Sequence, residues 1–118
     1  MNYLTFLIGL GARDSLRIEA GLCLYGNDIN EDTTPVEASL AWIVSKSRRS
    51  TAGFPGSEII LRQLKNGGDR KRIGIKGIGR GPPARPGTVI IDPELDETIG
   101  IVTSGCPSPS LGANIAMG

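Results

Sequence analysis

Frequent glycine is the feature that most constrains how this chain folds. Glycine fills 17 of the 118 positions, about twice its usual share of ~7%, and there are 8 prolines. Because both residues disfavour the interiors of helices and strands, the sequence predicts plentiful turns and irregular backbone. Aromatic residues make up only 4% of the chain, so we expect a mainly aliphatic core.

The residue types that are present narrow the chemistry of any site. Histidine is absent, which removes the usual general base at neutral pH and the commonest metal ligand. An acid or base would have to be a carboxylate, tyrosine, lysine or cysteine. Cys23 and Cys106 lie far apart, without the spacing of a metal site or a redox pair. We therefore expect two unpaired thiols in a reducing compartment and no metal site.

Size and polarity predict one ordinary soluble domain or less. With 39% hydrophobic and 21% charged residues, neither disorder nor a membrane span is indicated. The opening MNYLTFLIGLGAR has a short apolar run and no basic residue before Arg13. It therefore lacks the features of a secretory signal or a transit peptide, and it is too short to cross a bilayer.

Charge is strongly segregated along the chain, although its net value is +1. Residues 1–44 carry a net charge of −4, residues 45–85 carry +9, and residues 86–118 carry −4. The basic block, residues 45–85, fits an anionic ligand, an acidic protein partner, nucleic acid or simply a solvated face. No aromatic residue lies between Lys65 and Arg85. A surface that binds single-stranded nucleic acid also needs aromatic side chains on which the bases stack, and these are missing here.

Three helices are expected in the first part of the chain. Leu16 and Ala20 support a helix over residues 12–21, which Gly21 weakens. A third, short helix has Ser57 as a plausible cap and ends at Gly67.

The middle helix has the strongest start signal. Thr34 can cap it, Pro35 suits its first position, and Glu37 can complete a capping box. We expect it to run to about residue 47, with Arg48 and Arg49 at its C-terminal end. Its expected buried face comprises Val36, Leu40 and Ile43, flanked by Trp42 and Val44.

After residue 66 the apolar residues no longer recur at helical spacing, and they follow the pattern typical of β-strands. Residues 71–78 predict one strand, and residues 88–91 and 98–103 predict an antiparallel hairpin joined by residues 92–97. Residues 114–118 resemble the start of a strand without a partner, so we expect exposed ladder groups and a tendency to aggregate. The predicted fold class is α+β: helices that end one domain over residues 1–66, then an incomplete β-barrel over residues 67–118.

The sequence matches none of the general catalytic or nucleotide-binding motifs. The glycines between residues 74 and 81 fit neither a phosphate-binding loop nor a dinucleotide fingerprint. Without histidine, Ser104 and Ser108 cannot belong to a serine triad. Asp14 and Glu19 lie roughly 140° apart on the expected helix, so they are poorly placed to share a substrate.

Four blocks nevertheless resemble the glycine cleavage T-protein family in the same order and at similar spacings. They are ARDSLRIEAGLCLYGNDI (residues 12–29), TTPVEASLAW (33–42), FPGSEIILRQL (54–64) and IGIVTSGCPSPSLGANIAMG (99–118). The resemblance implies a mitochondrial aminomethyltransferase that transfers a one-carbon unit from the aminomethyl-lipoyl H-protein to tetrahydrofolate, with release of ammonia. It also implies a three-domain protein, of which this chain supplies the end of the folate-binding domain and the start of the C-terminal barrel.

The same resemblance implies which residues bind folate and which are missing. It assigns folate-binding roles to Arg13 and Trp42, and to Arg72 a role there or between the folate domain and the barrel. Surface ion pairing for Arg13, a core position for Trp42 and simple solvation for Arg72 are the alternatives. The family's catalytic aspartate, in a segment resembling LDD, and its pterin-binding GYTGEDG-like segment have no counterpart here, so we expect the chain to be inactive alone.

The residues themselves do not exclude other functions. The folate domain of a dimethylglycine or sarcosine dehydrogenase shares the implied architecture, although TSGCPSPSL and CLYGNDI favour the T-protein. A non-catalytic fragment and a small nucleic-acid-binding module are the remaining readings. The last would lose affinity steeply with salt.

Overall fold

The computed structural model describes residues 5–118. These residues fall into two compact units, each considered by itself. The first unit contains the chain up to Cys23 together with Gly74–Gly118, and the second contains Leu24–Ile73. Residues 1–4, part of the opening stretch discussed above, lie outside the described residues. The division of the chain into domains at residue 66 stays a prediction.

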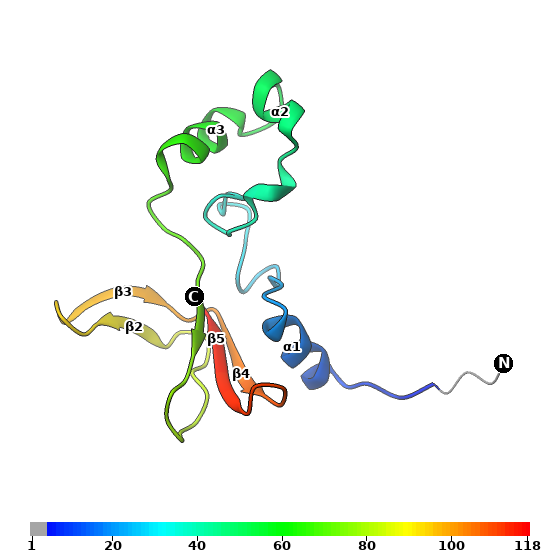
Figure 1. Cartoon of the computed structure of the whole chain (residues 1–118), viewed down its shortest axis with the longest axis vertical. Coiled ribbons are helices and arrows are strands. Elements are labelled where there is room, and N and C mark those ends of the chain that lie inside the picture. Colours follow the sequence, from blue (N-terminus) through cyan, green and yellow to red (C-terminus); the bar gives the residue numbers. More distant parts are fainter. Residues whose placement is uncertain (1–4) are drawn as a thin grey trace. The chain divides into compact units, whose positions relative to one another are not determined.

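The first unit is one helix and two small antiparallel sheets (Figure 1). The strand order of the larger sheet is β1-β5-β4, and the smaller sheet is the β2-β3 hairpin. Neither sheet closes on itself, and the mixture of helices and antiparallel strands confirms the predicted fold class. The bounds are α1 Leu10–Glu19, β1 Gly74–Lys76, β2 Val89–Asp92, β3 Glu97–Ile101, β4 Ser104–Ser108 and β5 Ala113–Met117.

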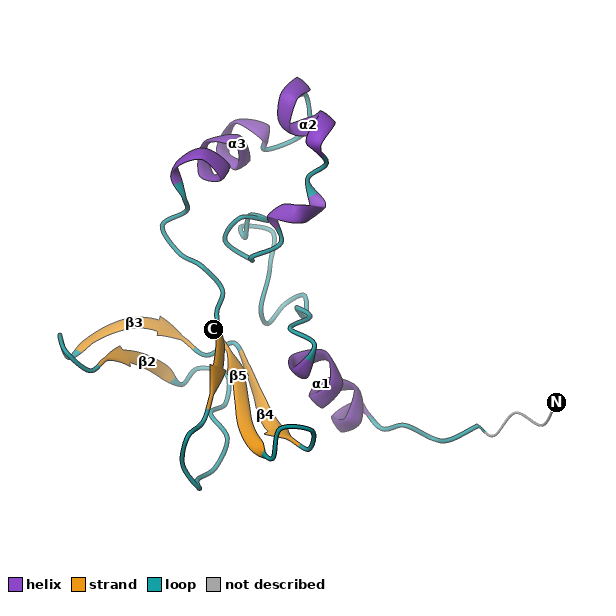
Figure 2. Ribbon diagram, in the orientation of Figure 1, coloured by secondary structure: helices purple, strands orange, loops and turns teal. Residues whose placement is uncertain are grey.

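A small apolar core joins α1 to the larger sheet. Ile18 of α1 packs with Cys106, Ile115 and Met117 of β4 and β5, and α1 lies beside these two strands (Figure 2). Ile18 is only 5% exposed, and burying such a side chain contributes about 1.5–3 kcal/mol relative to leaving it in water. The core is aliphatic and sulfur-containing, as expected from the scarcity of aromatic residues.

The helix over residues 12–21 is confirmed, shifted by two residues to Leu10–Glu19. It ends just before Gly21, as the sequence predicted, because Gly21 adopts a left-handed conformation (φ 69°). The N–H of Gly21 donates to Ile18 O and the N–H of Leu22 to Arg17 O. This pattern of closing hydrogen bonds is a Schellman motif.

The long helix expected up to residue 47 is wrong. The capping box does form, since Glu37 N donates to Thr34 Oγ1 (3.2 Å) and Thr34 N to Glu37 Oε2 (3.0 Å). The helical turn then closes at Ser39, whose φ is 58°, as the N–H of Leu40 donates to Pro35 O. Ser39 Oγ also donates to Arg72 O (3.0 Å), which helps to hold this unfavourable backbone conformation.

Two short helices replace the end of that expected helix. They are the 3₁₀ turn η1, Ala41–Ile43, and α2, Lys46–Thr51. Arg49 belongs to α2, and its guanidinium donates to Ala41 O (2.7 Å) and Val44 O (2.9 Å). Ile43 is 52% exposed, so its predicted place on a buried face is also wrong.

The third helix is confirmed as α3, Ser57–Asn66, and Gly67 ends it. Ser57 does not cap it, however. Gly56, in a left-handed conformation (φ 74°), occupies the N-cap position and Ser57 is the first helical residue.

The predicted hairpin is confirmed as β2 and β3, which pair from Val89↔Ile101 to Asp92↔Glu97 with a bulge after Ile90. Its strands were expected to continue to Thr103, but a new strand, β4, starts at Ser104. The expectation that residues 114–118 lack a partner is wrong. β5 is the central strand of its sheet, paired with β1 on one side and β4 on the other.

Gly105 of β4 lies against the backbone of the loop between β1 and β2. A Cβ atom at this position would overlap the carbonyl group of Ala84 and lie 3.2 Å from the Cβ of Ala116. Arg85 Nη1 donates to Gly105 O (3.2 Å) across the same contact. Glycine is thus required here by close approach of another part of the chain.

The carboxylate of Glu19, at the C-terminal end of α1, binds the C-terminal end of β4 and the turn that follows it. Glu19 Oε1 accepts hydrogen bonds from Ser108 Oγ (2.5 Å) and Ser110 N (3.2 Å), and Oε2 accepts one from Ser110 Oγ (2.8 Å). These donors, Ser108 first, lower the pKa of Glu19 from its usual value of 4.5 because they stabilise the charged form.

We expect Gly105→Ala to destabilise the first unit by about 1–3 kcal/mol or more, the usual cost of overpacking. The measurement is amide hydrogen exchange of β4 and β5 in the variant chain. Gly79→Ala is the matched control, because nothing lies within 4 Å of a Cβ at Gly79. Equal protection in both variants would contradict the close approach.

The lowered pKa of Glu19 predicts an acid-dependent contribution to stability. Since the folded pKa lies below the unfolded value, the contribution is present above about pH 4.5 and is lost as pH falls through the folded pKa. We expect a carboxyl NMR titration of Glu19 to have its midpoint below 4.5. Glu19→Gln should reduce the loss of stability in acid. A midpoint at or above the usual value would refute the prediction.

Candidate functional site

Arg13 lies in the first half of α1 with its side chain exposed. Its backbone N–H donates to Gly9 O (3.3 Å) and so belongs to the first turn of the helix. The exposed guanidinium offers five N–H donors in a planar fork. This geometry suits a carboxylate or another planar polar ligand.

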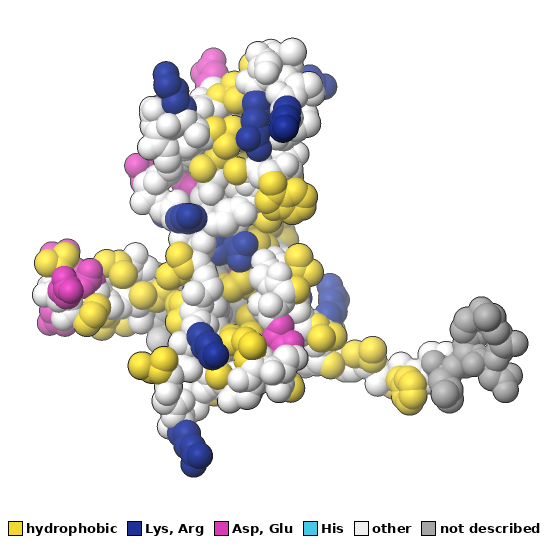
Figure 3. Space-filling model, in the orientation of Figure 1, with side chains coloured by type: hydrophobic (Ala, Val, Ile, Leu, Met, Phe, Trp, Pro, Cys, Tyr) yellow, Lys and Arg dark blue, Asp and Glu magenta, His cyan; other side chains and the backbone are white. Residues whose placement is uncertain are grey.

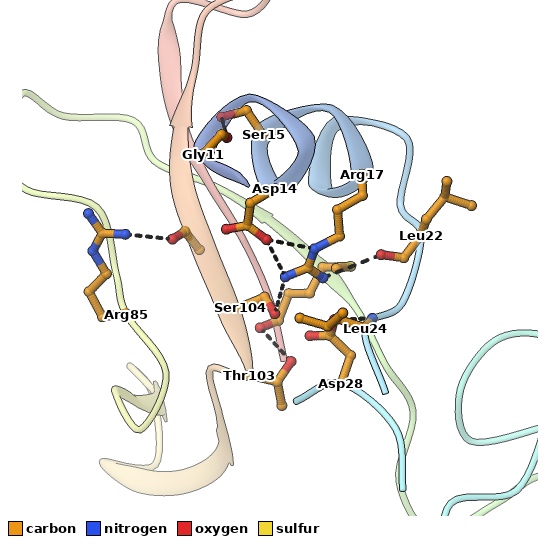
Figure 4. A network of polar contacts seen from close by, with 12 residues as sticks. Gly11, Asp14, Ser15, Arg17, Leu22, Leu24, Asp28, Arg85, Thr103 and Ser104 are labelled. Atoms are coloured by element: carbon orange, nitrogen blue, oxygen red, sulfur yellow. Dashed lines mark hydrogen bonds and ion pairs between the residues drawn. The ribbon is translucent and has the colours of Figure 1, made fainter. Parts of the chain in front are cut away.

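Arg17, one turn further along α1, is held by several partners (Figure 4). Its Nε donates to Asp14 Oδ1 (2.8 Å), its Nη2 to Ser104 Oγ (2.8 Å) and its Nη1 to Leu22 O (3.3 Å). The Arg17 side chain is 13% exposed, and Ser104 is buried. The guanidinium therefore ties the helix to β4, 87 residues away in sequence.

Sequence reasoning assigned no role to Arg17, and it considered Ser104 only to exclude a serine triad. The spacing of Asp14 and Arg17, three residues apart on a helix, was an available signal for their ion pair. The bond to Ser104 had no comparable signal, because it depends on how α1 packs against β4.

Trp42 lies on η1 in the second unit and is 76% exposed. An indole exposed to this extent contributes little to a core and leaves apolar surface available for stacking. The structure thus places Trp42 at the surface of its unit.

Arg72 is also in the second unit, where it binds the turn formed by residues 34–39. Its Nε donates to Ala38 O (2.8 Å) and its backbone N–H to Glu37 O (2.7 Å). Glu37 in turn pairs with Arg70 (3.4 Å), and the hydrogen bond from Thr34 N is the main cause that lowers its pKa. Arg72 therefore supports the turn that directly precedes η1.

Of the three predicted ligand-binding residues, Trp42 and Arg72 belong to the second unit and Arg13 to the first. Within the second unit, Arg72 holds the turn from which the chain continues into the 3₁₀ turn bearing Trp42. Among residues 5–118, no group of three or more His, Cys, Asp or Glu side chains is placed to hold a metal ion.

Charged side chains gather in different places on the surface. In the first unit, acidic side chains cluster at the tip of the β2-β3 hairpin, and in the second unit several lysine and arginine side chains lie on the visible face (Figure 3). The basic block includes α2 and α3 in the second unit. Within the part of the chain that the structure describes, no helix is long and apolar enough to span a membrane.

Comparison with known proteins shows two matching families that describe adjacent parts of one protein. Residues 3–48 match the GCVT N-terminal domain, and residues 70–118 match the glycine cleavage T-protein C-terminal barrel domain.

Individual relatives agree with these matches. The chain is 61% identical to the mitochondrial aminomethyltransferase of Gallus gallus over 93% of its own length and 27% of the relative's. It is 56% identical to that of Homo sapiens, over 95% and 27%. The crystal structure of the glycine cleavage system aminomethyltransferase T from Bartonella henselae matches with a TM-score of 0.85 and 50% identity, over 93% of this chain and 30% of that one.

The chain thus spans about a quarter of the length of the curated relatives that it matches. Its open sheets agree with that extent, since they correspond to part of the barrel domain. Two family matches that together cover most of the chain, and a solved structure of the same fold, lead to one conclusion: this chain belongs to the glycine cleavage T-protein family.

Proposed function

We propose that this chain is the folate-facing and barrel-starting segment of an aminomethyltransferase of the glycine cleavage system. In that reaction the aminomethyl group on the lipoyl arm of the H-protein passes its one-carbon unit to tetrahydrofolate, and ammonia is released. The observation that carries the proposal is the high identity to aminomethyltransferases over nearly the whole chain. The mitochondrial names of these relatives support a mitochondrial matrix location for the whole protein.

Arg13 is the proposed folate-binding residue with the strongest physical support. Its side chain is exposed on α1, in the ARDSLR motif that resembles the family's folate-binding segment. A charge-assisted hydrogen bond from a guanidinium is about twice as strong as a neutral one. Arg13 would therefore orient the polar groups of tetrahydrofolate.

Trp42 and Arg72 are the two further proposed folate contacts. The exposure of the Trp42 indole supports a stacking role over a place in a core. For Arg72, the bonds to Ala38 and Glu37 support a fixed position rather than a solvated one. The role proposed for Arg72 is a contact to folate or a bridge between the folate domain and the barrel domain.

The basic block has two proposed anionic partners under this function. Both the polyglutamate tail of folate and an acidic lipoyl-carrier protein would be attracted by eleven basic and two acidic residues over residues 45–85. Attraction of this kind weakens with salt, because the Debye length falls to about 8 Å at physiological ionic strength.

The chain by itself should not catalyse aminomethyl transfer. The 118 residues contain neither an LDD nor a GYTGEDG segment, and no histidine can replace the missing acid–base group. We expect no 5,10-methylenetetrahydrofolate from the purified chain supplied with aminomethylated H-protein and tetrahydrofolate. The positive control is the Gallus gallus relative with this chain in place of its matching segment, here called the chimera. Turnover by the isolated chain would overturn the expectation.

In the chimera, Arg13→Ala should weaken tetrahydrofolate binding by about 1.5–3 kcal/mol, or roughly 10- to 150-fold in Kd. Arg13→Lys should recover only part of the affinity, because an ammonium keeps the charge and loses the planar fork. Titration calorimetry measures both, and a thermal melt without ligand checks the fold. If Arg13→Ala lowers Tm but leaves Kd unchanged, the residue has a structural role and the folate contact is wrong.

A further inference from the structure

We propose that Arg17 is a positioning residue for folate binding: by clamping α1 to β4, it fixes the direction in which Arg13 presents its guanidinium. The inference rests on the folate-binding role proposed for Arg13. It assigns Arg17 no contact with the ligand.

The spacing of the two arginines makes such coupling direct. Residues four apart lie on the same side of a helix, one turn above the other. Arg13 is exposed, whereas the side chain of Arg17 is almost covered and bonded to β4. The helix is therefore held to β4 at Arg17, and it exposes the guanidinium of Arg13 one turn away.

Two attachments on one strand restrict both the roll and the tilt of α1. Arg17 binds Ser104 at the start of β4, and Glu19 binds Ser108 at its end. Four residues along a strand correspond to roughly 13 Å. One attachment would leave the helix free to pivot, and two attachments this far apart largely prevent it.

Small movements of α1 matter because hydrogen bonding to a ligand is geometrically demanding. At the outer radius of a helix, about 5–6 Å, a roll of about 20° displaces a side chain by roughly 2 Å. When reacting groups must be held in one geometry, a misplacement of about 1 Å can lower the rate about 100-fold. Loosening α1 is therefore enough to disturb a guanidinium fork.

The Arg17 fork is suited to such a clamp. It joins a carboxylate of its own helix, a hydroxyl of β4 and a carbonyl after the helix end. Ser104 is 2% exposed, and hydrogen bonds in such low-dielectric surroundings are stronger than those in water. Lysine would keep the charge but reach fewer of these partners at once.

A double-mutant cycle in the chimera tests the proposal. We expect Arg17→Ala and Ser104→Ala each to weaken tetrahydrofolate binding by the folded protein roughly 3- to 30-fold, within the range of coupling between neighbouring residues. In the Arg13→Ala background, the same substitutions should change Kd by less than about 2-fold. This non-additivity is the signature of action through Arg13, and Arg17→Lys should restore part of the affinity.

Ser15→Ala is the matched control on the same helix. Ser15 Oγ donates to Gly11 O (3.0 Å) within that helix, so the loss of this hydroxyl should leave Kd unchanged. If Arg17→Ala does not fold, Ser104→Ala and Arg17→Lys complete the cycle. Unchanged Kd with a lower Tm, or additive effects with Arg13→Ala, would overturn the inference while leaving the Arg13 contact in place. An unchanged Kd in Arg13→Ala alone would instead refute the folate contact and, with it, the inference.

Discussion

The attachment of α1 to β4 is the interaction on which the first unit depends. The unit is built from two stretches of chain separated by the fifty residues of Leu24–Ile73, so its helix must be held by contacts distant in sequence. Closing such a long connection costs conformational entropy that local hydrogen bonds do not repay. The buried cluster around Ile18 and Met117 supplies the apolar part, and the bonds of Arg17 and Glu19 to β4 supply the directional part. Apolar contact alone would tolerate a rolled helix, whereas hydrogen bonds with defined partners do not.

This arrangement fits a segment that supports a transferase by binding its ligand, as the proposed function requires. Under the proposed function, the segment contributes recognition: an oriented guanidinium at Arg13, an exposed indole at Trp42, and a basic surface for anionic partners. The second unit repeats the principle of a supported contact, since Arg72 binds the turn that precedes Trp42. In each unit, an arginine with several partners supports the part of the backbone that presents the proposed ligand contact.

Local signals in the sequence predicted those elements that depend on local contacts. The glycines at the ends of α1 and α3, the β-branched runs of the hairpin, and the aliphatic core were all anticipated. The capping box at Thr34 and Glu37 also formed as predicted. The helix it starts nevertheless stops after one turn, because Ser39 and Arg72 form a long-range hydrogen bond that favours a left-handed residue there. The same early stop leaves Trp42 at the surface instead of beside a buried helix face.

The sequence by itself determined the family, the fold class, the segregation of charge, and the positions of most turns, because these follow from composition, short-range period and motif. Only the tertiary structure decided that β5 lies between β1 and β4, that Gly105 must lack a side chain, and that Arg17 reaches Ser104. Each of these depends on which distant segments meet. A strand carries the same alternating pattern at the edge of a sheet and at its centre, and a glycine that makes room for a distant carbonyl looks the same in sequence as one that makes a turn. The physical reason is that local propensity is set by neighbouring residues, whereas pairing and close approach are set by the packing of the whole unit.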